Sequence, residues 1–206
     1  MSGKLEAKKG RRKKWPWIVG ACTLLAICIL VLFLLRKDII SGQPVLEVET
    51  PQRISLSGDR EFVLDVTVSD LGDAVYPAAS MSIAFDASCL EFLAVEEGNV
   101  FVTGDGDGRR LPEWICNVQK SNESGIINIM YLDMTGGKYA FRQDLLEEDD
   151  NVVLRLRFRL RGSVRAGDVY ELTVEDAVFA ASDESQSLAM TAGTLKTRNS
   201  RIVTGE

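Results

Sequence analysis

The sequence predicts an all-β domain, a two-sheet antiparallel sandwich or jelly roll of about nine strands, preceded by one transmembrane α-helix. Residues 45–206 alternate apolar and polar side chains with a period of two, which is typical of strands that bury one face. No stretch of about ten residues in this range has the apolar spacing of a helix. Upstream, residues 15–35 form an uncharged apolar run long enough to span a bilayer.

Charge divides the chain into two unlike parts. Residues 1–40 hold nine Lys/Arg and two acidic residues, which leaves 15 basic and 28 acidic side chains, a net charge of −13, for residues 41–206. An acidic domain repels phosphate backbones, so we expect no nucleic-acid binding. The chain contains no histidine, which excludes Ser-His-Asp and Cys-His nucleophiles and every histidine-containing metal site.

The run at residues 15–35 predicts a membrane span. Its 21 residues would extend roughly 31 Å at about 1.5 Å per helical residue. Trp15 and Trp17 stand at one end, where amphipathic rings prefer the headgroup layer. Seven basic residues precede the run and two follow it. The positive-inside rule then places residues 1–14 in the cytoplasm and, after a short linker at 36–44, the domain at 45–206 outside the cell membrane.

A cleaved signal peptide is the alternative for the same segment. It requires a shorter apolar run and a small-residue exit. Here the run is longer, and Leu35 is followed by Arg36 and Lys37, a poor cleavage site. We therefore expect a single-pass signal-anchor with Cys22 and Cys28 as small apolar residues of the helix.

The clearest strand runs from Val152 to Arg161, where leucine and phenylalanine alternate with arginine. Further strands are predicted at 45–49, 62–68, 79–85, 90–95, 114–119, 126–132, 170–175 and 194–203. Turn sequences rich in Gly and Asp separate them, at 57–59, 104–108, 136–137 and 167–168. The acidic run 144–150 is expected to be a loop with at most one helical turn. Short strands with this spacing are typical of two sheets packed face to face.

Three stretches resemble, in their order, the cellulosomal cohesin domain, the jelly-roll module of scaffoldin proteins. Residues 82–92 with Glu97-Gly98-Asn99 are similar to the family's aromatic-Asp-Pro-x-x-Leu-Glu turn and the glycine after it. Residues 125–133 resemble its glycine-led strand that ends in Asp, and residues 153–158, 167, 172–180 and 193–195 resemble its closing strands. The resemblance implies a non-catalytic module whose exposed sheet face binds a dockerin, a small calcium-loaded helical module on a secreted protein, in polysaccharide degradation.

Strand alternation indicates which side chains lie outward on such a face. If Met81, Ile83 and Phe85 point inward, their neighbours point outward, and the same holds for residues 127–131. The strand begun by Trp114 and the arginine strand add further outward residues. The predicted partner-binding residues are Ser80, Ser82, Ala84, Asn117, Gln119, Asn128, Met130, Leu132, Arg155, Arg157 and Arg159.

Two kinds of contact are expected from this set. Met130 and Leu132 would form an exposed apolar patch, and the arginines would suit carboxylate partners. The chain departs from better-known cohesins, which carry Asn and Asp near the position of Ser80, because residues 78–82 are small apart from the inward Met81. Structural alternatives remain: the arginines as the solvated face of a strand, which at a sheet edge would discourage pairing, and a loop at 136–150 that covers Met130 and Leu132.

No metal site or cofactor is predicted. The Gly/Asp run at 104–108 suggests calcium, but the twelfth position of an EF-hand loop counted from Asp105 is Cys116 rather than an acid, so a flexible turn is expected. Residues 147–150 are expected to be a solvated acidic loop. Cys89 and Cys116 are expected to be buried thiols, and an exterior location leaves a disulfide between them open.

Two other functions compete with dockerin binding. A carbohydrate-binding module tethering the cell to polysaccharide needs a planar row of exposed aromatic rings, but Trp114 is the only tryptophan in residues 45–206 and no strand face shows such a row. A structural part of an envelope assembly is suggested by the short linker at 36–44, which would hold the domain near the bilayer. No pair of carboxylates stands out for glycoside hydrolysis, so the protein is not expected to be an enzyme.

Overall fold

A computed structural model describes residues 44–50, 53–58, 60–103, 109–146, 151–181, 189–190 and 195–205. The chain divides into two units between Ser41 and Gly42, and all described residues belong to the second. The predicted tail at 1–14, the span at 15–35 and most of the linker lie outside the described residues. Within the described residues, no helix has the length and apolar character needed to cross a membrane.

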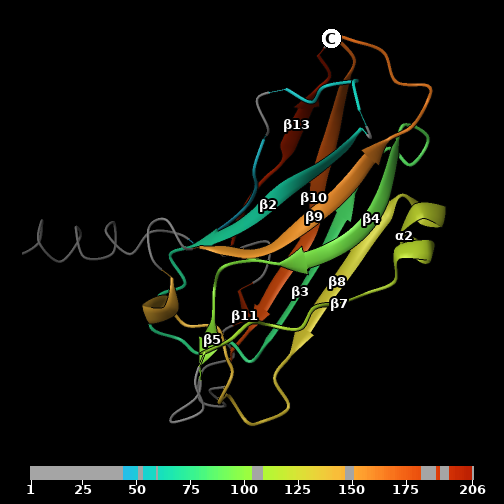
Figure 1. Cartoon of the computed structure of the whole chain (residues 1–206). Helices are drawn as coiled ribbons and strands as arrows, with labels where there is room; N and C mark the ends of the chain where they lie inside the picture. Colours follow the sequence, from blue (N-terminus) through green and yellow to red (C-terminus); the bar gives the residue numbers. More distant parts are fainter. Residues whose placement is uncertain are drawn as a thin grey trace, which may run out of the picture. The chain divides into compact units, whose positions relative to one another are not determined.

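The second unit is an all-β sandwich of two main sheets, as predicted (Figure 1). The first sheet has the order β12-β1-β2-β9-β4. Its strands are β1 (Val45–Val48), β2 (Glu61–Ser69), β4 (Leu90–Glu97), β9 (Val152–Leu160) and β12 (Lys196–Arg198). Neighbours are antiparallel except β1 and β12, which are parallel. Because β9 lies between β2 and β4, the arginine strand is interior to the sheet rather than at its edge.

The second sheet has the order β11-β10-β3-β8-β7, with β13 also paired to β10. Its strands are β3 (Ala78–Ala84), β7 (Ile115–Cys116), β8 (Ile126–Leu132), β10 (Val169–Ala180), β11 (Ala189–Met190) and β13 (Ser200–Val203). A separate short ribbon pairs β5 (Val102–Thr103) with β6 (Arg109–Arg110). Figure 1 shows β2, β9 and β4 forming one layer and β10, β3 and β8 the other.

Alternate side chains from both sheets fill the space between the layers. Phe158 of β9 lies among three rings, 5.7 Å from Phe62, 5.5 Å from Phe85 and 5.4 Å from Phe92 between centroids. The inward direction predicted for Met81, Ile83, Phe85, Ile127, Ile129 and Tyr131 is confirmed, since all are buried. Such burial stabilises the sandwich by about 25 cal/mol per Å² of apolar surface.

The strand predicted over 114–119 is wrong beyond Cys116. Residues Val118–Ser124 form helix α2 instead. Asn117 caps it, because its Oδ1 accepts a hydrogen bond from the backbone N–H of Lys120 at 2.9 Å. Gly125 ends it in the left-handed region, with φ 72°. The helix connects β7 to β8 and contacts β4 of the first sheet and β8 of the second, beside which Figure 1 shows it.

The strand predicted over 194–203 is two strands in different sheets. β12 pairs with β1 and β13 pairs with β10, and Asn199 lies between them. The side-chain oxygen of Asn199 accepts a hydrogen bond from the backbone N–H of Val174 at 3.0 Å, which holds the crossing point against β10. In the acidic loop, Gln143–Leu145 form one 3₁₀ turn, and residues 147–150 lie outside the described residues.

Candidate binding face

The outward side of β3, β8 and β7 is a continuous surface without charged side chains. Cross-strand neighbours on it are fixed by the sheet register: Ser80 lies beside Met130, Ser82 beside Asn128, and Ile115 beside Met130 on the other side. We name it the neutral face. Its members are Ala78, Ser80, Ser82, Ala84, Ile115, Ile126, Asn128, Met130 and Leu132.

Large apolar side chains on the neutral face are exposed. Met130 is 48% exposed, Leu132 50% and Ile115 60%. The described residues of the 136–150 loop therefore do not cover Met130 and Leu132. A hollow of about 620 Å³ lies over this surface, and no charged side chain lines it. Its lining residues are Ser80, Met81, Ser82, Ile115, Cys116, Asn117, Asn128, Ile129 and Met130.

Polarity changes along the neutral face. In one part of it Ser82 donates a hydrogen bond to Asn128 Oδ1 at 2.8 Å, and the neighbour of Ser82 on β10 is Asp176. At the end formed by β3 residue 78 and β8 residue 132, Leu132 is paired with Ala78, so that end is apolar. The hydrogen-bonding pair thus lies four residues along the strands from the apolar end, and Ala84 and Ile126 continue the face beyond it.

Asn117 and Gln119 were predicted to lie on an outward strand face. They belong instead to the N-cap and the first turn of α2. Asn117 still lines the hollow. The Gln119 side chain donates to Glu123 Oε1 at 2.9 Å within the helix and is not among the lining residues. Sequence reasoning missed Ile115 and Cys116; Ile115 shows its outward direction only once β7 is paired with Met130.

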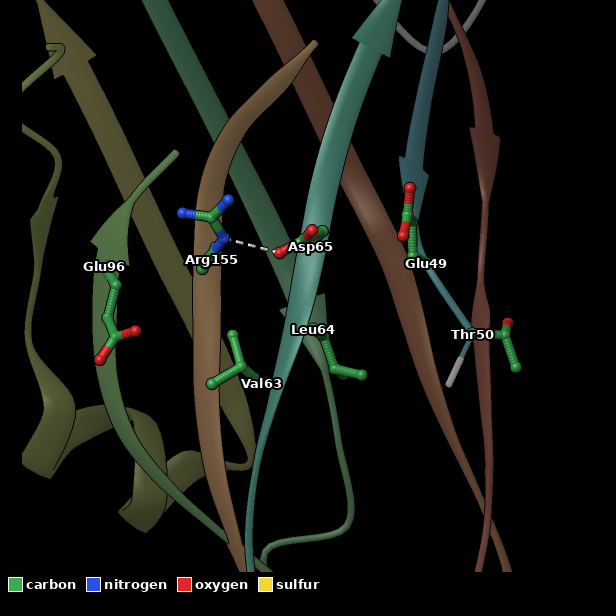
Figure 2. Close-up of a pocket in the computed structure, with 7 residues that line it drawn as sticks. All are labelled: Glu49, Thr50, Val63, Leu64, Asp65, Glu96 and Arg155. Carbon is green, nitrogen blue, oxygen red and sulfur yellow. Dashed lines mark hydrogen bonds and ion pairs between the residues drawn. The ribbon is translucent and has the colours of Figure 1, made fainter. Parts of the chain in front are cut away.

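The arginines lie on the other sheet. Each has an acidic partner on a neighbouring strand, β2 or β4, of the same sheet. Arg155 Nε lies 2.9 Å from Asp65 Oδ1, and Figure 2 shows this pair with Glu96 on the opposite side of Arg155. Arg157 lies 2.5 Å from Glu96 and 4.0 Å from Glu61.

The row continues with Arg159, which pairs with Glu61 and lies 3.5 Å from Glu91. Arginine side chains of β9 are thus flanked by carboxylates of β2 and β4. Half-exposed ion pairs of this kind contribute little stability each, about 0–1 kcal/mol. The structure consequently separates the predicted partner-binding residues that lie on strands into two sets on opposite sheets, and the arginine set is already engaged within the chain.

A tight loop follows the apolar end of the neutral face. The buried Asp133 carboxylate accepts hydrogen bonds from the backbone N–H of Thr135 (2.8 Å), Gly137 (2.9 Å) and Tyr139 (3.0 Å), and from the Thr135 hydroxyl (2.6 Å). Burial opposes ionisation, but these hydrogen bonds outweigh it and hold the Asp133 pKa below its ordinary value. The loop presents Met134, which is 83% exposed.

The cysteines of the domain, Cys89 and Cys116, are separate free thiols in the structure, both half-buried. Burial raises the pKa of Cys116, so this thiol is neutral near pH 7. In the described residues, no group of three or more Cys, Asp or Glu side chains is placed to hold a metal ion. The Gly/Asp run at 104–108, considered for calcium, and the acids at 147–150 lie outside them.

The Trp114 side chain contacts other residues of the domain. Its indole N–H donates to the carbonyl of Val153 at 3.0 Å, and its ring stacks on Phe141 at 5.7 Å between centroids. It also contacts Tyr131 at 5.6 Å. The ring therefore ties the residue before β7 to β9 and is not presented as a flat platform.

Comparison with known proteins identifies the fold. No protein-family model matches the chain, and no curated protein matches it. Solved structures, in contrast, do match the chain. The OlpA cohesin of Clostridium thermocellum, in complex with a dockerin, covers 79% of this chain and 99% of its own, with TM-score 0.58 and 16% identity. The third ScaC cohesin of Acetivibrio cellulolyticus, with the ScaB dockerin, covers 79% and 99%, with TM-score 0.59 and 12% identity.

A third relative comes from outside cellulosomes. The non-cellulosomal cohesin of the archaeon Archaeoglobus fulgidus covers 80% of this chain and 93% of its own, with TM-score 0.54 and 12% identity. At these identities the likeness concerns the fold. The described part of the chain is a cohesin-like module.

Proposed function

We propose that this protein is a non-catalytic binding module that captures a dockerin-bearing protein through the neutral face. The observation that carries the proposal is the exposure of Met130, Leu132 and Ile115 together on one sheet face of a cohesin-like fold. Exposed apolar patches on a folded domain are characteristic of interaction sites. Structural relatives were solved in complex with dockerins, which supports a dockerin as the partner here.

The proposal includes location at the cell surface, in polysaccharide degradation. The basic residues before the apolar run at 15–35 support an anchor with the amino terminus in the cytoplasm. Protease treatment of intact cells tests this: the domain should be digested while an epitope at the amino terminus is protected. Protection of the domain would contradict the proposed orientation.

Binding is tested by calorimetry with the detergent-solubilised full chain and calcium-loaded dockerins, including those solved with the relatives above and every dockerin encoded in the same genome. We expect at least one to bind, and Met130→Ser to weaken it about tenfold or more because an apolar contact is lost. Arg157→Gln, on the opposite sheet, is the matched control and should bind normally. Absence of binding to any dockerin would contradict the proposal.

Carbohydrate binding is the weaker candidate. A sugar platform needs rings that stand free, whereas the Trp114 indole is stacked on Phe141 and hydrogen-bonded to Val153. Retention of the full chain on insoluble glucan, lost on Trp114→Ala without loss of folding, would favour it over dockerin capture.

A further inference from the structure

The outward surfaces of the two sheets differ in chemistry although both belong to one acidic domain. On the first sheet the interior strand β9 presents Arg155, Arg157 and Arg159 between carboxylates. On the second sheet β3 presents only Ala and Ser outward. Charge is therefore present on one outward surface and missing from the strand at the centre of the other.

A charged partner group placed on the neutral face would lose hydration without gaining an ion pair there. Desolvating a charge without a counter-charge is strongly unfavourable. The nearest acid in register is Asp176, beside Ser82 and at the margin on β10. Face and partner are complementary only if the partner's contact surface is itself without charge over Met130, Leu132 and Ile115.

Small side chains on β3 also shape the surface. Ser80 lies between two larger neighbours in register, Val178 on β10 and Met130 on β8. Beyond it, Ala78 is flanked by Ala180 and Leu132. The hollow over Ser80, Ser82 and Met130 consequently leaves room for a partner's side chains to approach the β3 backbone.

Two parts of the neutral face favour different contacts. At the end with Leu132 and Met130 only apolar side chains of the partner gain by burial. Farther along the strands Ser82 and Asn128 already share a hydrogen bond, and both retain further hydrogen-bonding capacity. A partner is therefore oriented by this polarity, with its apolar side chains over Leu132 and its neutral polar groups over Ser82.

We infer that the neutral face recognises an uncharged dockerin surface, apolar over Met130 and Leu132 and hydrogen-bonding over Ser82 and Asn128, so that its affinity is nearly independent of salt. This inference rests on the proposed function and specifies the chemistry of the partner. It also states what the face rejects: a dockerin whose contact helix carries Lys, Arg, Asp or Glu at these positions.

The first test is the salt dependence of affinity for a calcium-loaded dockerin that binds the full chain. Exposed charge pairs are screened as ionic strength rises, whereas apolar contacts are not weakened. We expect Kd to change by less than about threefold between about 0.05 and about 0.5 M NaCl, because no charge pair is broken by screening. A loss of affinity of about tenfold or more would overturn the inference and leave dockerin capture standing; absence of any binding dockerin would overturn both.

The second test adds the same charge to each sheet. Met130→Asp should weaken binding by about a hundredfold because the carboxylate is desolvated without a partner. Val63→Asp is the matched control, since Val63 is 41% exposed on the opposite sheet beside Arg157. Equal effects of the two substitutions would contradict the assignment of the neutral face as the contact surface.

A third measurement needs no substitution and so does not depend on the variants folding. Cys116 lines the hollow and Cys89 does not. A bound dockerin should protect Cys116 from alkylation, measured by peptide mass spectrometry, and leave Cys89 alkylated at its free rate. Unchanged alkylation of Cys116 in the complex would overturn the inference.

Discussion

The Asn122 side chain makes two hydrogen bonds to the backbone of Phe92, in the place where a further strand would pair with this sheet edge. The Asn122 Oδ1 accepts from the backbone N–H of Phe92 at 2.9 Å, and its Nδ2 donates to the carbonyl of the same residue at 2.7 Å. Phe92 lies where the register of β4 shifts against β9, on a strand at the edge of its sheet. Helix α2 thereby satisfies the exposed edge and fixes the Phe92 ring against Phe158.

Replacing Asn122 with Ala should therefore destabilise the domain. Two backbone groups of Phe92 would lose their partners, at a cost of about 1–3 kcal/mol. Urea unfolding of the full chain measures the change in free energy. Asn128→Ala is the control: it removes one exposed hydrogen bond, to Ser82, and should change stability by no more than about 0.5 kcal/mol. Equal losses would show that the Phe92 contacts contribute nothing specific.

Gly98 admits no side chain. A Cβ there would lie 2.0 Å from the carbonyl oxygen of Val152, which accepts hydrogen bonds from the backbone N–H of Asn99 (2.8 Å) and of Val100 (3.1 Å). Gly98→Ala should cost about 3 kcal/mol, because backbone atoms have to separate. At Gly162 a Cβ meets open space, so Gly162→Ala should leave the unfolding free energy unchanged. A stable Gly98→Ala variant would contradict the close approach.

Tyr131 should make the domain sensitive to alkaline pH. Burial, with a smaller effect of the Asp133 charge, raises its pKa to about 12. Unfolded tyrosines lose their protons near pH about 10, so the unfolded state binds fewer protons above that pH and stability falls as pH approaches about 12. Below pH about 10 this contribution is fully present.

Unfolding free energy measured between pH about 9 and about 12, together with tyrosinate absorbance, checks this expectation. Burial also raises the pKa of Tyr76 and of Tyr170, so part of the loss should persist in Tyr131→Phe. A flat profile in the unmodified protein would contradict it.

Arg157→Gln should affect stability only slightly. Its pairs with Glu96 and Glu61 are half-exposed, and such pairs contribute about 0–1 kcal/mol. Dockerin affinity should be unchanged, because Arg157 lies on the sheet opposite the neutral face. A loss of affinity without a loss of stability would show that the arginines of β9 belong to the contact surface.

Which side of a strand faces the core could be predicted from the sequence, because alternation at a period of two fixes it without knowledge of neighbours. The directions of Ser80, Met130 and Arg155 are therefore as expected. The sheet to which each strand belongs depends on long-range pairing, which alternation does not contain. For that reason the arginines and the neutral face were expected to share one surface, although they lie on different sheets.

Helix α2 was missed because seven residues make only about two turns, too few for a periodic pattern. Its boundaries did leave a signal: Asn117 is a residue type preferred at the N-cap, and Gly125 at the position after the last turn. The sequence contains no signal for the pairing of Ile115 with Met130, because β7 has only two residues. The part of the neutral face on β7 thus required the structure.

Because β1 pairs with β12, the first sheet can be completed only after almost the whole domain has been synthesised. Leu46 lies beside Thr197, and Glu47 is paired with Arg198 at 2.8 Å, across almost the whole length of the domain. On a ribosome β1 emerges long before its neighbour exists, so one of its edges stays bare until residue 198 has been made. Contacts this far apart in sequence slow folding. Until β12 has been made, this edge of β1 in a nascent chain would thus be open to pairing with other polypeptides.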